Sequence, residues 1–243
     1  MNTTTKPQSA MISDDMLHSV ISQIARYQLT TFAAAQQLET FEGHGFRFVK
    51  AALKECQNRK WIGSAWLDSS RKYWFLQRKG AEALGLAKTR TGPLSEPAKI
   101  RSAGLLFFCL LGKRQRHLLM PSECRQYLGG EQQGGLPSGY YFVPDESRWL
   151  GLARIDAGHA GRWDRVVQSV REDVDHHVKI STLQQLISRR SFEITIVTVL
   201  PQKAVRLRET ISRYPDLNRI PVKVVACTEL LQLLATAPQK KGR

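Results

Sequence analysis

The chain has 243 residues, of which 42% are hydrophobic and 23% are charged. This composition is typical of one or two packed globular domains and excludes a chain that is disordered throughout. Lysine and arginine together number 36, against 21 aspartates and glutamates, which gives a formal net charge of +15. A basic excess of this size makes a polyanion the leading partner class, with nucleic acid ahead of an anionic membrane surface.

The longest uninterrupted apolar run, 103–111, is far shorter than the roughly 18 residues that a membrane-spanning helix needs. No signal-peptide pattern opens the chain. We therefore expect a soluble, cytoplasmic protein with no membrane partner. No C-x-x-C pair is present, so the cysteines are expected to be buried thiols and not a disulfide framework or a zinc site; they are Cys56, Cys109, Cys124 and Cys227.

The first half of the chain has the pattern of a small helical domain. Residues 1–12 are polar and are expected to form a flexible leader. Ser13 is a good N-cap, and the helical spacing of apolar residues after it predicts a first helix that ends near Tyr27. A short helix over 32–38 and a glycine-containing turn are expected next. A third helix then starts at Phe46, with an apolar stripe made by Phe46, Val49, Leu53 and Cys56.

Two segments of strand composition, 60–67 and 72–76, predict a hairpin, and a helix over 78–84 follows it. This order of elements is the plan of a winged helix-turn-helix domain over residues 13–88, in which the third helix enters the major groove of DNA. On that helix a second face carries Arg47, Lys50 and Lys54. The other expected contacts with DNA are Arg59, Lys60, Arg71 and Lys72. The alternative interpretation of this face is a solvated helix surface without a partner.

The second half predicts an α/β domain. A linker is expected at 89–97 because Gly, Pro, Ser and Thr gather there, and the α/β domain is placed at 98–237, before a basic tail at 238–243. Its alternation of strands and helices predicts a sheet with a parallel portion covered by helices. The expected elements are a buried helix over 98–111, a glycine-rich loop over 129–139, strands over 140–143, 149–155, 192–200 and 222–226, and helices over 160–178, 182–189, 201–214 and 228–235.

Two acids in this half are candidates for metal-dependent catalysis. Asp145 and Asp156 come at the ends of consecutive strands, where nucleases use converging carboxylates to bind Mg²⁺. However, Arg154 stands two residues before Asp156 and would repel a divalent cation. We therefore expect no resident metal or other cofactor. His176 and His177 are adjacent on a helix and cannot chelate one ion together, so they are interpreted as a polar helix end.

Two further groups of residues have plain structural interpretations. The helix after Pro201 is basic and either gives the second domain a positive surface or is simply solvated; its cations are Lys203, Arg206, Arg208 and Arg213. The tryptophans are expected to be mainly core anchors; they are Trp61, Trp66, Trp74, Trp149 and Trp163.

Three segments together resemble a known family. They are QRKGAEALGL, PDESRWLGLARIDAG and FEITIVTVL, and with them the chain resembles the replication-relaxation family of plasmid and integrative-element proteins over about residues 14–210. The resemblance implies an N-terminal winged helix-turn-helix and a restriction-endonuclease-like domain with Pro-Asp and Glu-x-Asp motifs on consecutive strands. Pro144, Asp145 and Asp156 match these motifs, but Arg154 occupies the place of the Glu. This departure favours binding of DNA without cleavage.

The sequence thus predicts an α/β (α+β overall) protein that binds double-stranded DNA as an accessory or regulatory protein of a mobile genetic element, in replication, transfer (conjugation) or transcription control. A homodimer on two half-sites and contacts with replication or conjugation proteins are further expectations. One alternative is a Mg²⁺-dependent nuclease that uses Asp145 and Asp156, with a third acid from Glu123 or Glu146. The other is a winged-helix protein-interaction module of a conjugation or replication complex.

Overall fold

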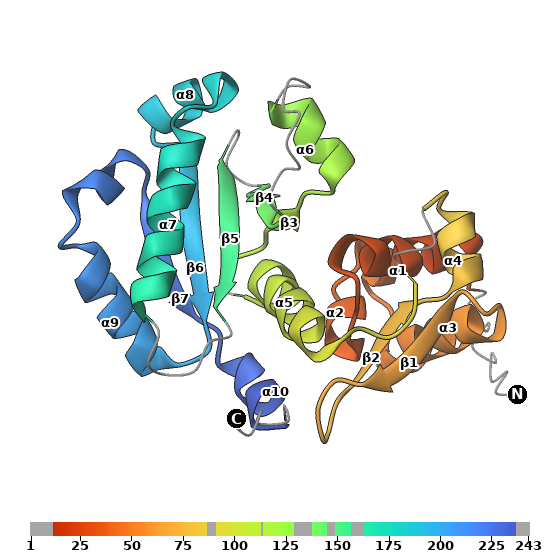
Figure 1. The fold of residues 1–243 in the computed structure, drawn as a ribbon. Helices are drawn as coiled ribbons and strands as arrows, with labels where there is room; N and C mark the ends of the chain where they lie inside the picture. Colours follow the sequence, from red (N-terminus) through yellow and green to blue (C-terminus); the bar gives the residue numbers. More distant parts are fainter. Residues whose placement is uncertain are drawn as a thin grey trace, which may run out of the picture.

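The computed structural model describes residues 12–86, 91–112, 114–128, 138–144, 149–156 and 163–236. The protein is a mixed α/β protein with two separate sheets, as the alternation of helical and strand patterns predicts (Figure 1). A two-stranded sheet belongs to the first part of the chain, and a five-stranded sheet belongs to the second.

The first part is a small helical unit with its own apolar core. Ser13 caps the first helix by accepting a hydrogen bond from the backbone N–H of Met16, which confirms the predicted cap, and Thr31 caps the second helix through Ala34 in the same way. Leu17, Ile21, Leu53 and other buried side chains fill the core between the helices. The helices are α1 (Asp14–Tyr27), α2 (Phe32–Ala35), the short 3-10 helix η1 (Glu39–Phe41) and α3 (Phe46–Asn58).

The hairpin that follows uses both of its faces. Its strands pair antiparallel, with Trp66 opposite Lys72 near the turn, and α4 (Arg78–Ala83) comes after them; the strands are β1 (Ile62–Trp66) and β2 (Lys72–Leu76). Because side chains alternate along a strand, Ile62 and Leu76 face the core of the first unit while Tyr73 and Phe75 face the other way. Tyr73 and Phe75 pack against residues from the later part of the chain.

The predicted buried helix lies between the two sheets, as Figure 1 shows. It consists of α5 (Glu96–Leu106), which continues as a turn of π-helix, η3 (Phe107–Leu111). Leu106 and Phe108 are almost fully buried and join one apolar cluster that also holds Tyr73 of the hairpin and Val197 of the large sheet. One hydrophobic core therefore crosses the position of the predicted linker at 89–97.

The five-stranded sheet has the order β3-β4-β5-β6-β7. β4 pairs antiparallel with both β3 and β5, whereas β5, β6 and β7 run parallel, so the predicted parallel portion is confirmed. Every residue of β6 is buried, as its dense run of β-branched side chains predicts. The strands are β3 (His117–Leu118), β4 (Tyr140–Phe142), β5 (Leu150–Asp156), β6 (Phe192–Thr198) and β7 (Val222–Ala226).

Helices cover both faces of this sheet. Alternate side chains of β6 enter different clusters: Ile194 packs on the outer face, and Val197 packs on the face toward α5. The outer helices are α7 (Trp163–His177), α8 (Ser181–Ser188), α9 (Pro201–Ile211) and η4 (Pro215–Arg219). On the face toward α5 lie η5 (Thr228–Leu230) and α10 (Leu231–Thr236).

Some details differ from the sequence-based expectations. Phe46 is 57% exposed, and its ring contacts that of Phe32 in a tilted arrangement instead of joining the core stripe of α3. His177 is fully buried, so the interpretation of the histidine pair as a polar helix end is wrong for this residue. The strand β3 and the helix α6 (Pro121–Leu128) were not expected. The predicted glycine-rich loop lies outside the described residues from 129 to 137.

All four cysteines are buried and free, which confirms the expectation of thiols without a disulfide. Among the described residues, no helix is both long and apolar enough to span a membrane.

Candidate nucleic-acid interface

The third helix presents an exposed cationic face. Arg47, Lys50 and Lys54 are all exposed, and their spacing of three and four residues places them on one side of α3. Within the part of the chain that the structure describes, no ion pair or side-chain hydrogen bond engages any of the three. Glu55, the one acid in the sequence of α3, lies off this face. The three charges are therefore available to an external anion.

The end of α3 is held to the first helix. Arg59 donates hydrogen bonds to Glu55 at 2.9 Å and to Asp14 at 2.7 Å, and its guanidinium lies 5.1 Å from the centroid of the Trp61 ring. The hydrogen bond from Arg59 lowers the pKa of Glu55, so this carboxylate stays ionised at neutral pH. Of the two cations predicted to contact DNA at this end of the helix, Arg59 is thus engaged inside the protein, whereas Lys60 is exposed.

The face of the hairpin opposite Tyr73 and Phe75, here called its outer face, continues the surface of α3. The amide of Gln57, in the last turn of α3, donates a 3.4 Å hydrogen bond to the hydroxyl of Ser64 on β1. Trp66 and Lys72 follow on the same face, paired across the two strands, with the Lys72 Nζ 5.0 Å from the centroid of the Trp66 ring. Trp66 is 58% exposed, so the expectation that the tryptophans are core anchors is wrong for this residue.

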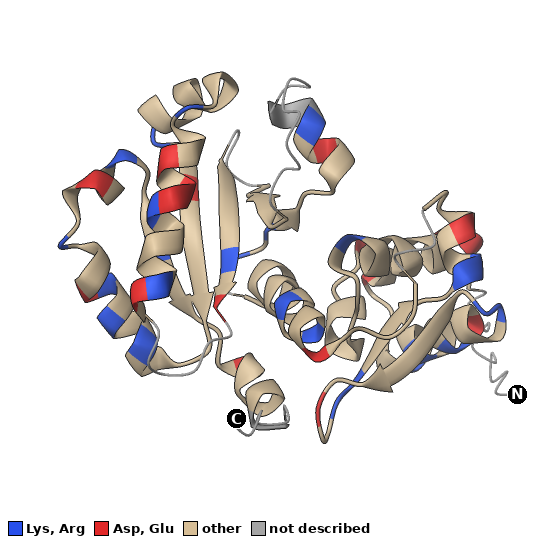
Figure 2. Cartoon of the chain, viewed as in Figure 1, with Lys and Arg blue, Asp and Glu red and all other residues tan. Residues whose placement is uncertain are grey.

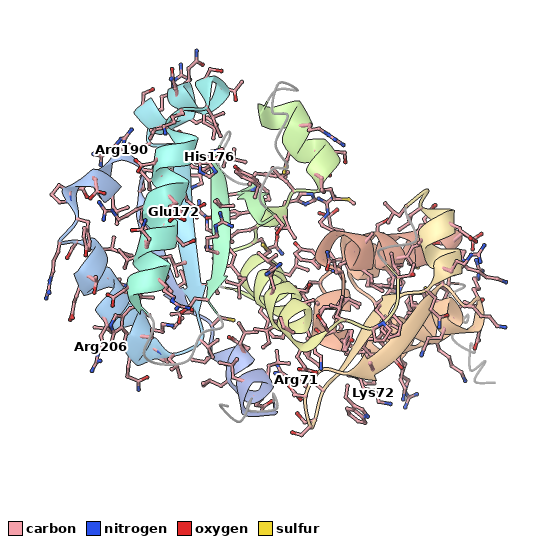
Figure 3. All side chains as sticks on the ribbon, in the orientation of Figure 1. Arg71, Lys72, Glu172, His176, Arg190 and Arg206 are labelled. Atoms are coloured by element: carbon pink, nitrogen blue, oxygen red, sulfur yellow. The ribbon has the colours of Figure 1, made fainter. Side chains whose placement is uncertain are left out.

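Arg71 points to the opposite side of the hairpin from Lys72, as the labels in Figure 3 show. Its Nε lies 2.6 Å from a carboxylate oxygen of Asp68, and its Nη2 donates to the backbone carbonyl of Glu229 in η5 at 2.8 Å. Burial acts to raise the pKa of Asp68, but the hydrogen bonds from Ser70 and Arg71 outweigh it and lower the pKa. Arg71 therefore fastens the hairpin turn to the second half of the chain.

We call the resulting region the α3–hairpin surface; its members are Arg47, Lys50, Lys54, Gln57, Ser64, Trp66 and Lys72. It contains four cations and no acid. Figure 2 shows that basic residues also occur on the large α/β unit, so charge alone does not single out this surface. What distinguishes it is the combination of three cations without an ion pair on one helix face with an exposed aromatic ring on the adjoining strand.

The cations of α9 have different environments. The side chain of Lys203 is only 2% exposed, which contradicts the expectation that it belongs to a positive surface. Arg208 donates two hydrogen bonds to the backbone carbonyl of Val224 on β7. Arg206 lies with its guanidinium 5.0 Å from the centroid of the Trp163 ring, on the far side of the molecule from Lys72 (Figure 3).

Asp156, a candidate metal ligand, is an ion-pair partner in the structure. It stands at the carboxyl end of β5, where the Lys203 Nζ lies 2.7 Å from its Oδ2 and the Thr198 hydroxyl donates to the same oxygen at 3.1 Å. Asp145 and Glu146 lie outside the described residues. The described residues that flank them, Pro144 and Trp149, lie near the start of β5. Asp156 is at its other end, six residues after Leu150, which corresponds to roughly 20 Å along the strand.

The other polar groups near this sheet are also paired internally. Arg154, which stands in the place of the expected Glu, makes a two-pronged ion pair with Asp173 of α7. Glu123, one of the two candidates for the third acid of a nuclease site, makes a similar pair with Arg26 of α1. The described residues contain no group of three or more His, Cys, Asp or Glu side chains that could hold a metal ion.

A buried histidine lies next to the Arg154 ion pair. The Nε2 of His177 is 2.6 Å from the Tyr140 hydroxyl, and its Nδ1 is 2.5 Å from the backbone carbonyl of Asp173. The carbonyl can only accept, so Nδ1 carries the proton and Nε2 accepts from Tyr140. Burial lowers the pKa of His177. The ring is therefore neutral at physiological pH and has a structural role.

Comparisons with known proteins identify no relative: no family model, no curated protein and no solved structure matches the chain. The resemblance to the replication-relaxation family therefore remains an expectation from the sequence.

Sequence reasoning found the cationic residues of α3 but missed three polar and aromatic members of the α3–hairpin surface. Ser64 and Trp66 alternate along β1 with the small residues Gly63 and Ala65, and this period of two marks them as one face of a strand. That pattern could have placed Ser64 and Trp66 together. Gln57 is recognisable only once the strand is known to lie beside the end of α3.

Proposed function

We propose that the protein is a DNA-binding accessory or regulatory protein of a mobile genetic element, which uses the α3–hairpin surface to bind duplex DNA. The observation that carries the proposal is the unpaired cationic face of α3, formed by Arg47, Lys50 and Lys54, directly beside the outer face of the hairpin. An α-helix fits the major groove, and exposed cations beside it can neutralise phosphates on either strand.

The local architecture supports this role for the helix. In a winged helix-turn-helix the third helix is presented by two supporting helices. Here α1 and α2 pack behind α3 through Ile21 of α1, Ala35 of α2 and Val49 of α3, all of them fully buried. The buried stripe faces these helices and leaves the cationic side to solvent. In this proposal Lys72 takes the position of a wing residue that contacts a phosphate, and Lys60 contacts the backbone at the other end of the hairpin.

The large unit is proposed to be a restriction-endonuclease-like domain that has a binding or assembly role. In support, β4 and β5 form an antiparallel pair, and β5 is followed by helix α7 and the parallel strand β6. We propose no catalytic step, because Asp156 is paired with Lys203 and Arg154 is paired with Asp173. The unit would then serve as a site for replication or conjugation proteins or for a second copy of the chain.

The test is fluorescence anisotropy with labelled duplexes of about 30 base pairs from the DNA that flanks the gene, and with scrambled duplexes of the same composition, at two salt concentrations. The variant is Arg47→Ala/Lys50→Ala. The matched control is Lys179→Ala/Arg213→Ala, which removes the same charge from exposed positions on the large unit.

We expect the α3 variant to lose at least roughly tenfold in affinity for the flanking duplex and to show a shallower salt dependence. The control variant should lose less than about threefold, since a uniform charge effect is spread over the whole molecule. Equal losses in both variants, with no preference for the flanking duplex, would contradict the proposal and favour a protein-interaction module.

A further inference from the structure

Trp66 is unusually exposed for a large aromatic side chain. With 58% of its surface accessible, it has the largest exposed fraction among the exposed large hydrophobic residues in the described ranges. The four other tryptophans are at least partly buried; they are Trp61, Trp74, Trp149 and Trp163. An aromatic ring of this size offers a large apolar area to a partner. It lies on β1, the strand whose Ser64 contacts Gln57 in the last turn of α3, and Lys72 is the cation beside it.

The hairpin that carries Trp66 is fixed by contacts of its inner face, its backbone and its turn with the rest of the protein. Tyr73 and Phe75 on the inner face of the hairpin are buried in the core shared with α5 and η3. The Nζ of Lys99 in α5 donates to the backbone carbonyl of Trp66 at 3.4 Å, and Arg71 ties the hairpin turn to η5. Because the backbone of this strand is already fixed in the free protein, a contact made by the ring costs little conformational entropy.

The surroundings of the ring fit a nucleic acid. The ammonium of Lys72 lies 5.0 Å from the centroid of the Trp66 ring, where it can reach a phosphate next to a base that stacks on the indole. Acids in the neighbouring elements are engaged in ion pairs, Asp68 with Arg71 and Glu55 with Arg59. Glu96 is paired with Lys99, the residue that also donates to the Trp66 carbonyl. Cations that follow a backbone, together with an aromatic ring for a base, are the usual elements of a stacking platform.

We propose that Trp66 stacks on a base that has left the double helix, so that the α3–hairpin surface prefers duplex DNA containing unpaired bases over fully paired duplex. The inference rests on the proposed function, because it requires α3 to hold the duplex. In a fully paired duplex each base already stacks on its neighbours, so the indole finds a free base face only at an open or kinked step. The ligand class is therefore a locally melted or distorted duplex.

The test compares a fully paired duplex with the same duplex carrying a central two-base mismatch in which one adenine is replaced by 2-aminopurine. Anisotropy gives the affinity for each duplex, and the 2-aminopurine emission reports whether the base stacks on a protein ring. The variants are Trp66→Ala, Trp66→Phe and the matched exposed-residue control Leu231→Ala, each checked by thermal unfolding.

The expected result is that the wild type binds the mismatched duplex roughly tenfold more tightly than the paired one, which is a typical value for stacking one base on an aromatic ring. Trp66→Ala should abolish this preference and the change in 2-aminopurine emission. Trp66→Phe should retain part of the preference, and Leu231→Ala should retain all of it.

Two results would overturn the inference. One is a wild type that binds both duplexes equally through Arg47 and Lys50, which would leave the proposed function intact. The other is a preference that persists in Trp66→Ala. Failure of the wild type to bind either duplex more tightly than the Arg47→Ala/Lys50→Ala variant would overturn the proposed function as well.

Discussion

Replacing Asp156 by alanine, the obvious variant for a nuclease, should above all destabilise the protein. The Lys203 and Asp156 side chains are 2% and 9% exposed, and their charged atoms lie 2.7 Å apart. Asp156→Ala removes one partner of a buried ion pair, a change that typically costs about 3–5 kcal/mol. For a chain of this length, 1 kcal/mol corresponds to about 2–4 °C, so we expect the melting temperature to fall by roughly 6–20 °C.

The assay is thermal unfolding followed by circular dichroism, applied to Asp156→Ala and to a double-mutant cycle made of Asp156→Leu, Lys203→Met and the two combined. Asp156→Leu/Lys203→Met replaces both charges by apolar side chains and should recover most of the loss, because no buried charge is left without its partner. Asp164→Ala, at an exposed position on α7, is the control for a lost carboxylate and should cost less than about 1 kcal/mol. A loss below 1 kcal/mol for Asp156→Ala, or strictly additive effects in the cycle, would refute the reasoning.

Three further predictions concern stability. Gly151→Ala places a Cβ 2.3 Å from the ring of the buried Tyr141, so it should cost about 1–3 kcal/mol in chemical denaturation. Burial acts to raise the pKa of Glu123, but the hydrogen bonds from Arg26 and a backbone N–H outweigh it and lower the pKa. The wild-type protein should therefore lose stability as the pH decreases below about 4.5. Glu123→Gln should lose less stability over the same pH range. Because burial lowers the pKa of His177, stability should decline as the pH falls below 6.5, and less steeply in His177→Gln.

Each of these measurements has an outcome that contradicts it. A Gly151→Ala protein as stable as the wild type would mean that Tyr141 moves aside freely. The signs of the two pH effects follow from the unfolded chain, which binds more protons than the folded one when the folded pKa is lower. Parallel curves for wild type and Glu123→Gln below pH 4.5, or for wild type and His177→Gln between pH 5 and 6.5, would exclude those side chains as the cause.

Local patterns in the sequence were sufficient to predict most elements of the fold. The Ser13 cap, the buried run of β6 and the strand β7 are set by residues adjacent in the chain, and the structure has them where they were expected. The elements that were not expected have weak local signals: β3 consists of His117 and Leu118 alone, and it is defined by pairing with β4 more than 20 residues later.

The pairing of charged side chains could not be predicted for a similar reason. Arg71 and Lys72 are neighbours in sequence and equivalent in composition. In the structure Arg71, in the turn before β2, reaches η5, whereas Lys72, the first residue of β2, is exposed to solvent. Lys203 looked like one more exposed cation on α9, yet its partner Asp156 is 47 residues earlier in the sequence. Which charges are free to meet a ligand depends on such long-range contacts.

The core that spans the two units has a practical consequence for dissecting the protein. A fragment that ends near residue 88 would keep the helices of the first unit but would expose Leu67, Tyr73 and Phe75, which the full chain buries against α5, η3 and η5. Such a fragment would expose an apolar patch that favours aggregation, and its hairpin would lack the residues that it packs against in the full chain. Expression boundaries for binding studies should therefore extend beyond η5.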